Sequence, residues 1–176
     1  MLLLNGYQGI EMYMFKICVL LYADDIVPFS QTPEVLQIGF NILQEYCNTW
    51  NMKVNVGRTK VMFFRKSGLL PMNLLFEYNG EMEEMVNVFS YLGIVFTAGG
   101  SFNQTQITRA GQSRKANFKI NKYVYNFTNI SIKHRLELFD KLLLPILNYG
   151  CEVEGLHTAN NIERVHTQYC KKHFKC

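Results

Sequence analysis

Two apolar stretches near the N-terminus flank a short acidic turn. Residues Phe15 to Tyr22 and Ile26 to Ser30 are rich in β-branched and aromatic side chains, which favours two strands. Asp24 and Asp25 stand between them. The pattern predicts a hairpin with two adjacent carboxylates at its tip, although Pro28 stands where the second strand is expected to donate a ladder hydrogen bond.

A helix is predicted directly after this hairpin. Thr32 suits the N-cap position, Pro33 suits the first turn, and Glu34 adds an early acidic residue. Apolar side chains then recur at helical spacing, at Leu36, Phe40, Leu43, Cys47 and Trp50. A stripe of this kind indicates a helix that packs against a sheet.

Short strands and turns are predicted between residues 53 and 96. The strands are expected at residues 53–56, 60–64, 74–78 and 89–96. Gly57-Arg58 separates the first two, and Asn79-Gly80 is expected to form a hairpin turn after the third.

The second half of the chain reads as helical. Two helices are predicted, at residues 104–127 and 132–148, and Ser131 is the expected N-cap of the second. Gly99-Gly100-Ser101 precedes them and is the best candidate for a hinge. Strands followed by helices predict an α+β fold.

Composition and charge are consistent with a folded chain whose charge is unevenly distributed. The 176 residues are 48% hydrophobic and 14% aromatic, enough to bury the core of one domain or two small subdomains. The net charge of +4 is the sum of −3 for residues 1–101, +6 for residues 102–150 and +1 for residues 151–176. The basic excess therefore lies in the helical segment.

The first predicted helix carries most of this excess. It carries Arg109 and four further cations that fall within one broad face, Arg114, Lys115, Lys119 and Lys122. Such a face can follow a phosphate backbone without reading sequence. The alternative is a solvated helix surface that contacts nothing.

The cysteines and histidines do not form a recognisable metal site. Five cysteines without a CxxC pair indicate reduced intracellular thiols. His166, Cys170 and His173 share one helical face, with His157 and Cys176 nearby, but their spacing is not that of a structural zinc site, so no zinc is expected.

No membrane partner is expected either. The N-terminus lacks a basic leader, and Lys16 interrupts the only long apolar run. We expect a soluble or partner-bound intracellular protein, with nucleus or cytoplasm left open.

The adjacent carboxylates of Asp24 and Asp25 are the strongest candidates for chemistry. Two like charges side by side repel, and a divalent cation relieves that repulsion. Mg²⁺ takes one or two protein carboxylates and completes its shell with water and phosphate oxygens. The alternative is a solvated Asp-Asp turn between two strands.

Four blocks of sequence carry a resemblance to a known family. They are Leu20 to Val27, Asn51 to Met62, Phe89 to Ile94 and Leu142 to Glu152. In this order and spacing they resemble the reverse transcriptases of non-LTR, LINE-like retrotransposons. The resemblance extends from about Asn5 to the C-terminus.

The resemblance implies a partial polymerase palm, of antiparallel strands with a backing helix, followed by a helical thumb. The implied limits are 1–98 for the palm, 99–101 for the hinge, 102–150 for the thumb and 151–176 for a basic C-terminal helix or tail. The family's earlier Asp-bearing strand and its fingers are not in this sequence. A fragment of an RNA-directed DNA polymerase, inactive alone, is therefore expected.

The resemblance also implies roles near the metal. Asp24 would be the chief Mg²⁺ or Mn²⁺ ligand, Asp25 a supporting one, and Tyr22 would lie close to the primer end. Arg58 or Lys60 would face pyrophosphate. Because the family usually has Lys where this chain has Arg58, an acid role would pass to Lys60. A basic surface turn is the alternative.

Further implied roles concern nucleic acid. Phe89 and Tyr91, on one strand face, would belong to the primer grip, and the alternative is that they are sheet core. The cations Arg114, Lys115, Lys119 and Lys122 would hold the RNA template and the RNA/DNA hybrid. A deoxynucleotide would bind only with the missing upstream half.

Two functions of other classes stay open at this point. The chain is alternatively a non-catalytic nucleic-acid-binding module or an inert retroelement remnant. Glu154, where the family often has an aromatic residue, and Pro28 are both compatible with a decaying copy. An upstream palm strand and fingers in the same frame would decide for the polymerase.

Overall fold

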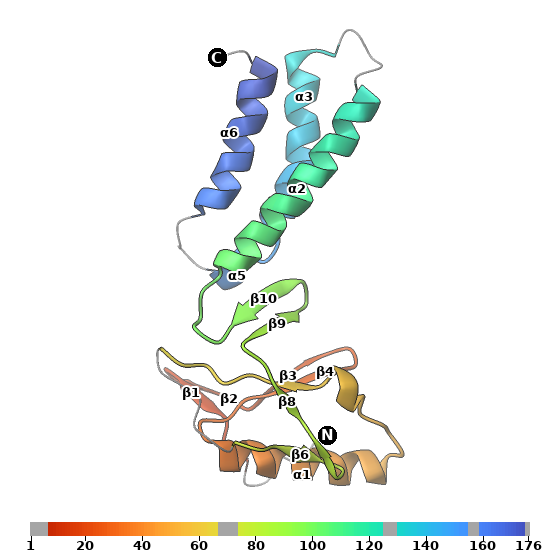
Figure 1. Cartoon of the computed structure of the whole chain (residues 1–176), viewed down its shortest axis with the longest axis vertical. Helices are drawn as coiled ribbons and strands as arrows, with labels where there is room; N and C mark the ends of the chain where they lie inside the picture. Colours follow the sequence, from red (N-terminus) through yellow and green to blue (C-terminus); the bar gives the residue numbers. More distant parts are fainter. Residues whose placement is uncertain (1–6, 67–73, 125–129, 155–158, 175–176) are drawn as a thin grey trace. The chain divides into compact units, whose positions relative to one another are not determined.

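The computed structural model describes residues 7–66, 74–124, 130–154 and 159–174 (Figure 1). The chain divides into two compact units. We call residues 1–63 and 67–87 the hairpin unit, and residues 64–66 and 88–176 the helical unit. Strands dominate the first unit and helices the second, which confirms the predicted α+β class.

Two antiparallel hairpins open the hairpin unit. They are β1 (Ile10–Met12) with β2 (Phe15–Ile17), and β3 (Val19–Tyr22) with β4 (Asp25–Pro28). The single strand predicted from Phe15 to Tyr22 is wrong, because the chain changes pairing partner at Cys18: Ile17 pairs back with Ile10, and Val19 pairs forward with Pro28.

Pro28 fits the hairpin without losing a hydrogen bond. It is opposite Val19 at the end of β4, and the next residue, Phe29, donates its N–H to the Cys18 carbonyl at 2.8 Å. Hydrogen-bonded and non-hydrogen-bonded pairs alternate in an antiparallel ladder, so Pro28 occupies a pair that needs no donor. The expected conflict does not arise.

Helix α1 (Pro33–Thr49) begins as predicted, and its predicted apolar stripe packs inward except for the last residue. The Thr32 hydroxyl accepts from the Val35 N–H at 3.4 Å, and Pro33 occupies the first turn. Phe40 lies in a core with Val61, Phe76 and Tyr78, and its ring meets Phe76 and Tyr78 edge-on. Trp50, expected in the apolar stripe, is instead 64% exposed just after the helix.

The rest of the hairpin unit is built from very short elements. A 3₁₀ turn, η1 (Val56–Arg58), replaces the strand predicted at residues 53–56, because the N–H groups of Arg58 and Thr59 both return to the Asn55 carbonyl. The remaining strands are β5 (Lys60–Val61), β6 (Glu77–Tyr78), β7 (Glu81–Met82) and β8 (Glu84–Met85). β6 and β7 form the predicted hairpin at Asn79-Gly80, and β5 pairs with β8 in parallel.

The helical unit starts with another hairpin. β9 (Val88–Tyr91) pairs with β10 (Ile94–Thr97) across a turn at Leu92-Gly93, so the continuous strand predicted at residues 89–96 is wrong. Leu92 and Gly93 both have positive φ, 48° and 76°. A two-residue turn with two positive φ values is of type I′, which suits the twist of a hairpin.

The helices follow in the predicted order. They are α2 (Asn103–Val124), α3 (Ile132–Leu138), the π-helical turn η2 (Phe139–Leu143), α4 (Leu144–Leu147), α5 (Cys151–Glu154) and α6 (Asn160–Phe174). Ser131 caps α3, accepting from the His134 N–H, as expected. The π turn precedes Pro145, which has no N–H to donate and whose ring crowds the preceding turn.

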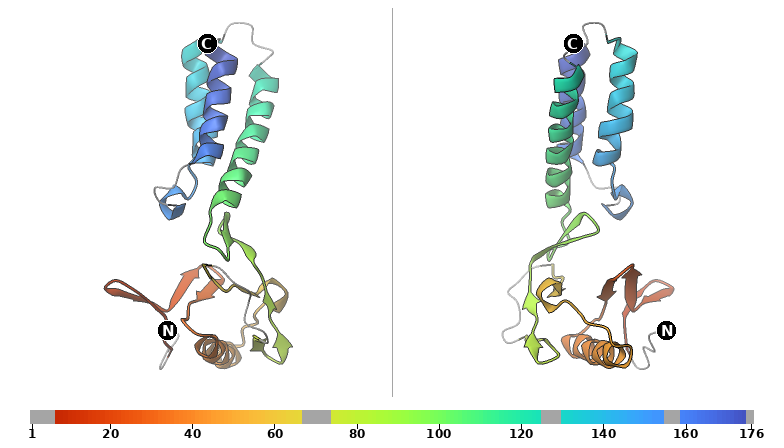
Figure 2. Two further views of the ribbon diagram at one scale, coloured as in Figure 1. Left: turned by 60° about the vertical axis from the view of Figure 1, so that its left-hand side comes forward. Right: turned by 90° about the vertical axis from the view of Figure 1, so that its right-hand side faces the viewer.

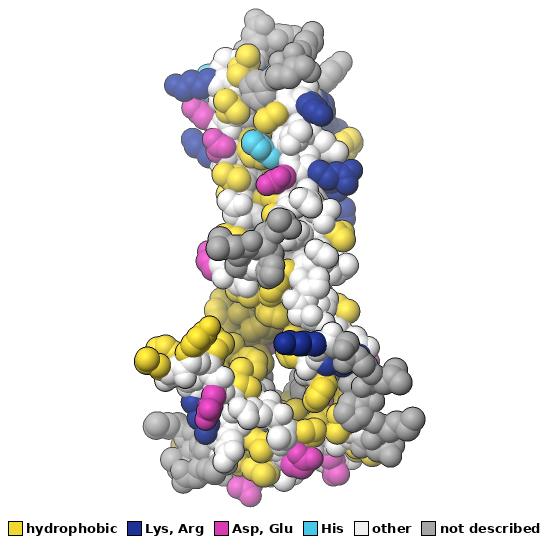
Figure 3. Space-filling model, turned by 90° about the vertical axis from the view of Figure 1, so that its left-hand side faces the viewer, with side chains coloured by type: hydrophobic (Ala, Val, Ile, Leu, Met, Phe, Trp, Pro, Cys, Tyr) yellow, Lys and Arg dark blue, Asp and Glu magenta, His cyan; other side chains and the backbone are white. Residues whose placement is uncertain are grey.

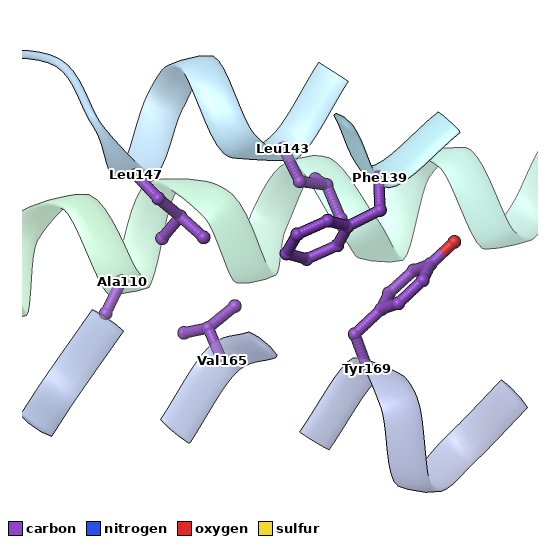
Figure 4. Packing of buried hydrophobic residues seen from close by; sticks show 6 residues of the cluster. All are labelled: Ala110, Phe139, Leu143, Leu147, Val165 and Tyr169. Atoms are coloured by element: carbon purple, nitrogen blue, oxygen red, sulfur yellow. The ribbon is translucent and has the colours of Figure 1, made fainter. Parts of the chain in front are cut away.

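Figures 1 and 2 show α2, α3 and α6 side by side in the helical unit. Figure 4 shows the core between them, in which Ala110 of α2 and Val165 and Tyr169 of α6 meet residues of η2 and α4. Those residues are Phe139, Leu143 and Leu147. The Tyr169 hydroxyl donates to the Arg135 carbonyl at 2.6 Å, which joins α6 to α3.

A buried ion pair ties α2 to α5. Arg109 and Glu154 are only 2% and 6% exposed, and Arg109 Nη1 lies 2.5 Å from Glu154 Oε1. Gln106, one turn before Arg109, also bonds the Glu154 carboxylate, at 3.4 Å. Arg109 is therefore not available to nucleic acid, and Glu154 has a buried structural partner.

We predict that Glu154→Ala destabilises the helical unit by about 3–5 kcal/mol, because it leaves the Arg109 guanidinium buried without its counter-charge. Denaturant unfolding followed by far-UV circular dichroism measures the loss. The exposed neighbour Glu152→Ala is the matched control, expected to shift stability by less than about 0.5 kcal/mol.

The double variant Arg109→Met with Glu154→Leu separates charge burial from lost volume. Replacing both members of a buried pair by apolar residues is often close to neutral, so this variant should regain most of the lost stability. Equal losses in Glu154→Ala and Glu152→Ala would contradict the prediction.

Candidate metal hairpin and nucleic-acid face

The β3–β4 hairpin holds the two candidate metal ligands. Tyr22 pairs with Asp25, which leaves Ala23 and Asp24 as a two-residue turn. Ala23 has a φ of 53°, a left-handed conformation that is costly for a residue with a Cβ. The tight turn places Asp24 at the tip and Asp25 at the first position of the returning strand.

Both carboxylates face solvent. Asp24 and Asp25 are exposed, and no ion pair found within the described residues involves either of them. The described residues contain no group of three or more metal-ligating side chains. Two adjacent carboxylates are hard oxygen donors that fit a cation which completes its shell from water and phosphate. The pair can therefore supply part of a divalent-metal site.

Tyr22 is the aromatic neighbour of this pair. Its side chain is 61% exposed, and it is the register partner of Asp25. Leu20 and Leu21, further back on β3, are exposed as well. The three predicted residues of this motif, Tyr22, Asp24 and Asp25, thus lie together on one open hairpin.

The two candidate pyrophosphate cations differ in their surroundings. Arg58 is exposed at the end of η1. Lys60, on β5, is opposite Glu84 in the parallel pair, and Lys60 Nζ lies 2.8 Å from Glu84 Oε2. The charge of Lys60 is already partly neutralised, so Arg58 is the cation more accessible to an anion.

Glu83 is a buried carboxylate that the sequence did not single out. It lies between β7 and β8, and neither carboxylate oxygen has a hydrogen-bond partner among the described residues. Burial raises the pKa of Glu83 above its ordinary value; nearby Lys60 opposes the rise and Glu81 adds to it. Only the acidic run at residues 81, 83 and 84 signals it in the sequence.

The predicted primer-grip residues share a strand face as expected. Phe89 and Tyr91 are half-buried on β9, alternating with exposed Val88 and Ser90. Phe89 is opposite Phe96 of β10, and the Phe96 ring meets Phe102 at 6.1 Å between ring centroids. The alternative reading as sheet core is therefore compatible with their packing.

This hairpin is bonded to the helices that follow it. The Thr105 hydroxyl donates to the Val95 carbonyl at 2.7 Å and accepts from the Val95 N–H at 3.1 Å. The Tyr149 hydroxyl donates to the Leu92 carbonyl at 2.9 Å. The structure consequently divides the chain between Asn87 and Val88, upstream of the predicted hinge.

The predicted hinge at residues 99–101 is a hydrogen-bonded turn. Thr97 holds both ends of it: its hydroxyl donates to the Ser101 carbonyl at 2.9 Å and accepts from the Ser101 N–H at 3.0 Å. The Gly100 N–H also returns to the Thr97 carbonyl. The assignment of residues 1–98 to a palm and of residues 102–150 to a thumb stays a prediction.

The cations of α2 divide into one buried and four exposed residues. Arg109 is buried in its ion pair, whereas the other four face solvent: Arg114, Lys115, Lys119 and Lys122. No acidic residue occurs in α2. The exposed four form what we call the basic face, and Figure 3 shows cations on the surface of the helical unit.

The C-terminal helix brings one histidine close to one cysteine. Cys170 Sγ lies 3.6 Å from His166 Nε2, and the His166 ring packs on Phe139. The side chain of His173, together with His157 and Cys176, lies outside the described residues. Cys18, Cys47, Cys151 and Cys170 are free. In the part of the chain that is described, no helix is long and apolar enough to cross a bilayer.

Residues 3–96, more than half of the chain, match the sequence profile of a family described as reverse transcriptase (RNA-dependent DNA polymerase). The chain belongs to the reverse transcriptase family. The matched segment contains Tyr22, Asp24, Asp25, Arg58 and Lys60, together with Phe89 and Tyr91. The basic face of α2 lies beyond it.

Individual relatives extend the similarity to mobile elements. The chain is 22% identical over 82% of its length to the RNA-directed DNA polymerase from mobile element jockey of Drosophila melanogaster. It is 20% identical over 89% of its length to the protein of the same name from Drosophila funebris. A putative transposon-derived protein of Caenorhabditis elegans is 28% identical over 78% of the chain.

The chain spans 16% and 18% of the two jockey proteins and 49% of the nematode protein. No solved structure matches the chain. The expected resemblance to retrotransposon reverse transcriptases is confirmed, and it rests on low identity over a small part of the jockey proteins.

We predict that Glu83→Gln stabilises the hairpin unit by about 1–2 kcal/mol near neutral pH, because it removes a buried charge that has no hydrogen-bond partner among the described residues. Because the pKa of Glu83 is raised in the folded state, ionisation of Glu83 costs no stability while the carboxyl is protonated in both states. Stability is lost as pH rises from the unfolded pKa through the folded pKa. The gain should therefore disappear below about pH 4.

Fluorescence of Trp50, the single tryptophan of the chain, reports unfolding of the hairpin unit in which it lies. Glu77→Gln, at an exposed position on β6, is the control. A gain from Glu83→Gln that is the same at acidic and neutral pH would contradict the assignment.

Proposed function

We propose that this chain forms the later part of a retrotransposon reverse transcriptase core, a partial palm followed by a helical thumb. The observation that carries the proposal is the exposed Asp24-Asp25 pair at the tip of a hairpin, inside the segment that matches the family. The mobile-element names of the relatives support the retrotransposon source.

In the proposed enzyme, Asp24 is the chief ligand of Mg²⁺ or Mn²⁺ and Asp25 supports it. The bound metal ions would polarise phosphoryl oxygens and offset the charge that develops during nucleotidyl transfer. Tyr22, next to the turn, would lie close to the primer end. These three side chains are exposed on one hairpin, which supports a shared site.

Arg58 is the better candidate for the cation that faces pyrophosphate. It is exposed, whereas Lys60 is engaged with Glu84. Arginine keeps its proton, so Arg58 would stabilise the leaving group as a charge and would not act as a general acid. An acid role for Lys60 would require Lys60 to leave its carboxylate partner.

The basic face of α2 is proposed to hold the RNA template and the RNA/DNA hybrid, and Phe89 and Tyr91 to hold the primer. Four exposed cations without an acid on the same helix favour phosphate contacts. These contacts do not depend on the metal site, so a nucleic-acid-binding module without catalysis is the second candidate function.

We predict that the 176-residue chain binds RNA/DNA hybrid with an affinity that falls steeply with salt. If the four cations of the basic face each neutralise one phosphate, affinity should fall about 100-fold between about 50 and about 200 mM salt. Fluorescence anisotropy titrations measure it. Absence of binding at low salt, or binding that salt does not weaken, would contradict the proposal.

Charge reversal locates the contact. Lys115→Glu with Lys119→Glu should weaken binding at least about 10-fold, because two phosphate contacts are lost and two repulsions added. Lys171→Glu with Lys172→Glu changes the net charge equally on exposed positions of α6, and should weaken binding much less. Lys53→Glu should also have little effect on binding.

We predict that these 176 residues alone do not extend a primer. Two-metal transfer needs carboxylates on both sides of the ion pair, and no group of three or more metal-ligating side chains occurs among the described residues. Positioning supplies most of phosphoryl-transfer catalysis, so a half-built site should lose several orders of magnitude in rate.

The measurement is primer extension on an RNA template with Mg²⁺ or Mn²⁺, with and without an added upstream palm and fingers from a related enzyme. Extension that requires the added half and is abolished by Asp24→Ala would support the proposal. Extension by the chain alone that Asp24→Ala abolishes would overturn it.

A further inference from the structure

An aromatic ring stands in the middle of the basic face. Phe118 is 74% exposed on α2, with Arg114 and Lys122 one turn to either side of it. Lys115 and Lys119 complete its surroundings at three residues before and one after. The ring is thus bordered by cations.

The packing of the helical unit does not use the Phe118 ring. The core is formed by the opposite side of α2, through Ala110, Ala116 and Ile120. No ring contact of Phe118 occurs among the described residues. A phenyl group left in water forgoes the free energy that its burial would contribute. What distinguishes Phe118 from the other exposed apolar side chains of α2 is its place among four cations.

The geometry points to Phe118 as a stacking platform for an unpaired nucleic-acid base, with the four cations holding the flanking phosphates. The inference rests on the proposed nucleic-acid contact. It goes further in specifying that the bound strand is single and that its base is unstacked. Single-strand binding sites commonly combine cations that follow the backbone with aromatic rings on which bases stack.

Charge complementarity favours nucleic acid over a membrane. A membrane-surface helix needs a broad apolar face opposite its cations. On α2 the exposed apolar side chains are few, Ile107, Phe118 and Tyr123, and Phe118 lies among the cations instead of opposite them. A polyanion that carries aromatic bases matches this arrangement, whereas a lipid surface does not.

An unpaired base is favoured over a duplex for a geometric reason. In a hybrid duplex the faces of the bases are covered by their neighbours, and a protein reaches only grooves and phosphates. A ring on a helix can stack only on a base whose face is free. The cations would still hold a duplex, but Phe118 would contribute little to that binding.

The test compares a single strand of about 12 nucleotides with a blunt RNA/DNA hybrid of the same length, each binding the full chain. Phe118→Ala should weaken single-strand binding about 5-fold or more and leave hybrid binding within about 2-fold. Phe118→Trp should keep single-strand affinity, because it restores a stacking ring.

Ile107→Ala is the matched control, since Ile107 is 51% exposed on the same helix but lies outside the basic cluster. It should leave both affinities unchanged. A 2-aminopurine base in the single strand gives a direct signal, because stacking on Phe118 should change its fluorescence in the parent protein and not in Phe118→Ala.

The outcomes separate this inference from the proposed function. Salt-dependent binding by the parent protein with no effect of Phe118→Ala overturns the stacking role alone. No binding by the parent protein overturns both. Equal losses for single strand and hybrid, or tight binding to anionic phosphatidylserine vesicles that needs Phe118, also contradict the inference.

Discussion

The repulsion between two adjacent carboxylates is the constraint on which the proposed chemistry depends. The β3–β4 register fixes Asp25 opposite Tyr22 and forces Ala23 and Asp24 into a two-residue turn. The turn holds the carboxylates next to each other in water, where a divalent cation relieves their repulsion. A change of register by one residue would turn Asp25 to the other face of the hairpin and move Asp24 out of the turn.

In the helical unit, the corresponding constraint is the buried Arg109–Glu154 pair. Together with Thr105 and Tyr149 it fastens α2, α5 and the β9–β10 hairpin to one another. A side chain at Gly150 would be strained, because the residue has a positive φ of 67° and a Cβ there would lie 2.7 Å from Ile94 Cδ1. In the proposal, the primer-holding residues of β9 and the basic face therefore belong to one compact unit.

Local signals in the sequence predicted the helices well, because a cap needs only neighbouring residues. Thr32, Pro33 and Ser131 mark real helix starts. Strand limits were harder, since a strand is defined by its partner: Cys18 and Leu92 both stand where an apolar run continues but the pairing changes. The motif from Tyr22 to Asp25 could be predicted because the resemblance to the family and the hairpin pattern of the sequence point to the same residues.

The residues that sequence reasoning missed are those whose role depends on distant contacts. Arg109 resembles its exposed neighbours in sequence, yet it is buried because Glu154, far along the chain, meets it. Glu83 lies in an acidic run that reads as surface. The exposure of Phe118 also needed the structure, because its spacing alone does not tell which side of α2 packs on α6.

Binding of Mn²⁺ to the chain is the measurement that tests the central claim most directly. Paramagnetic broadening of amide resonances during a Mn²⁺ titration should be strongest for Tyr22 to Ile26, and it should be lost in Asp24→Asn with Asp25→Asn. Broadening that is absent from the β3–β4 hairpin, or that persists there when both carboxylates are replaced, would contradict the account.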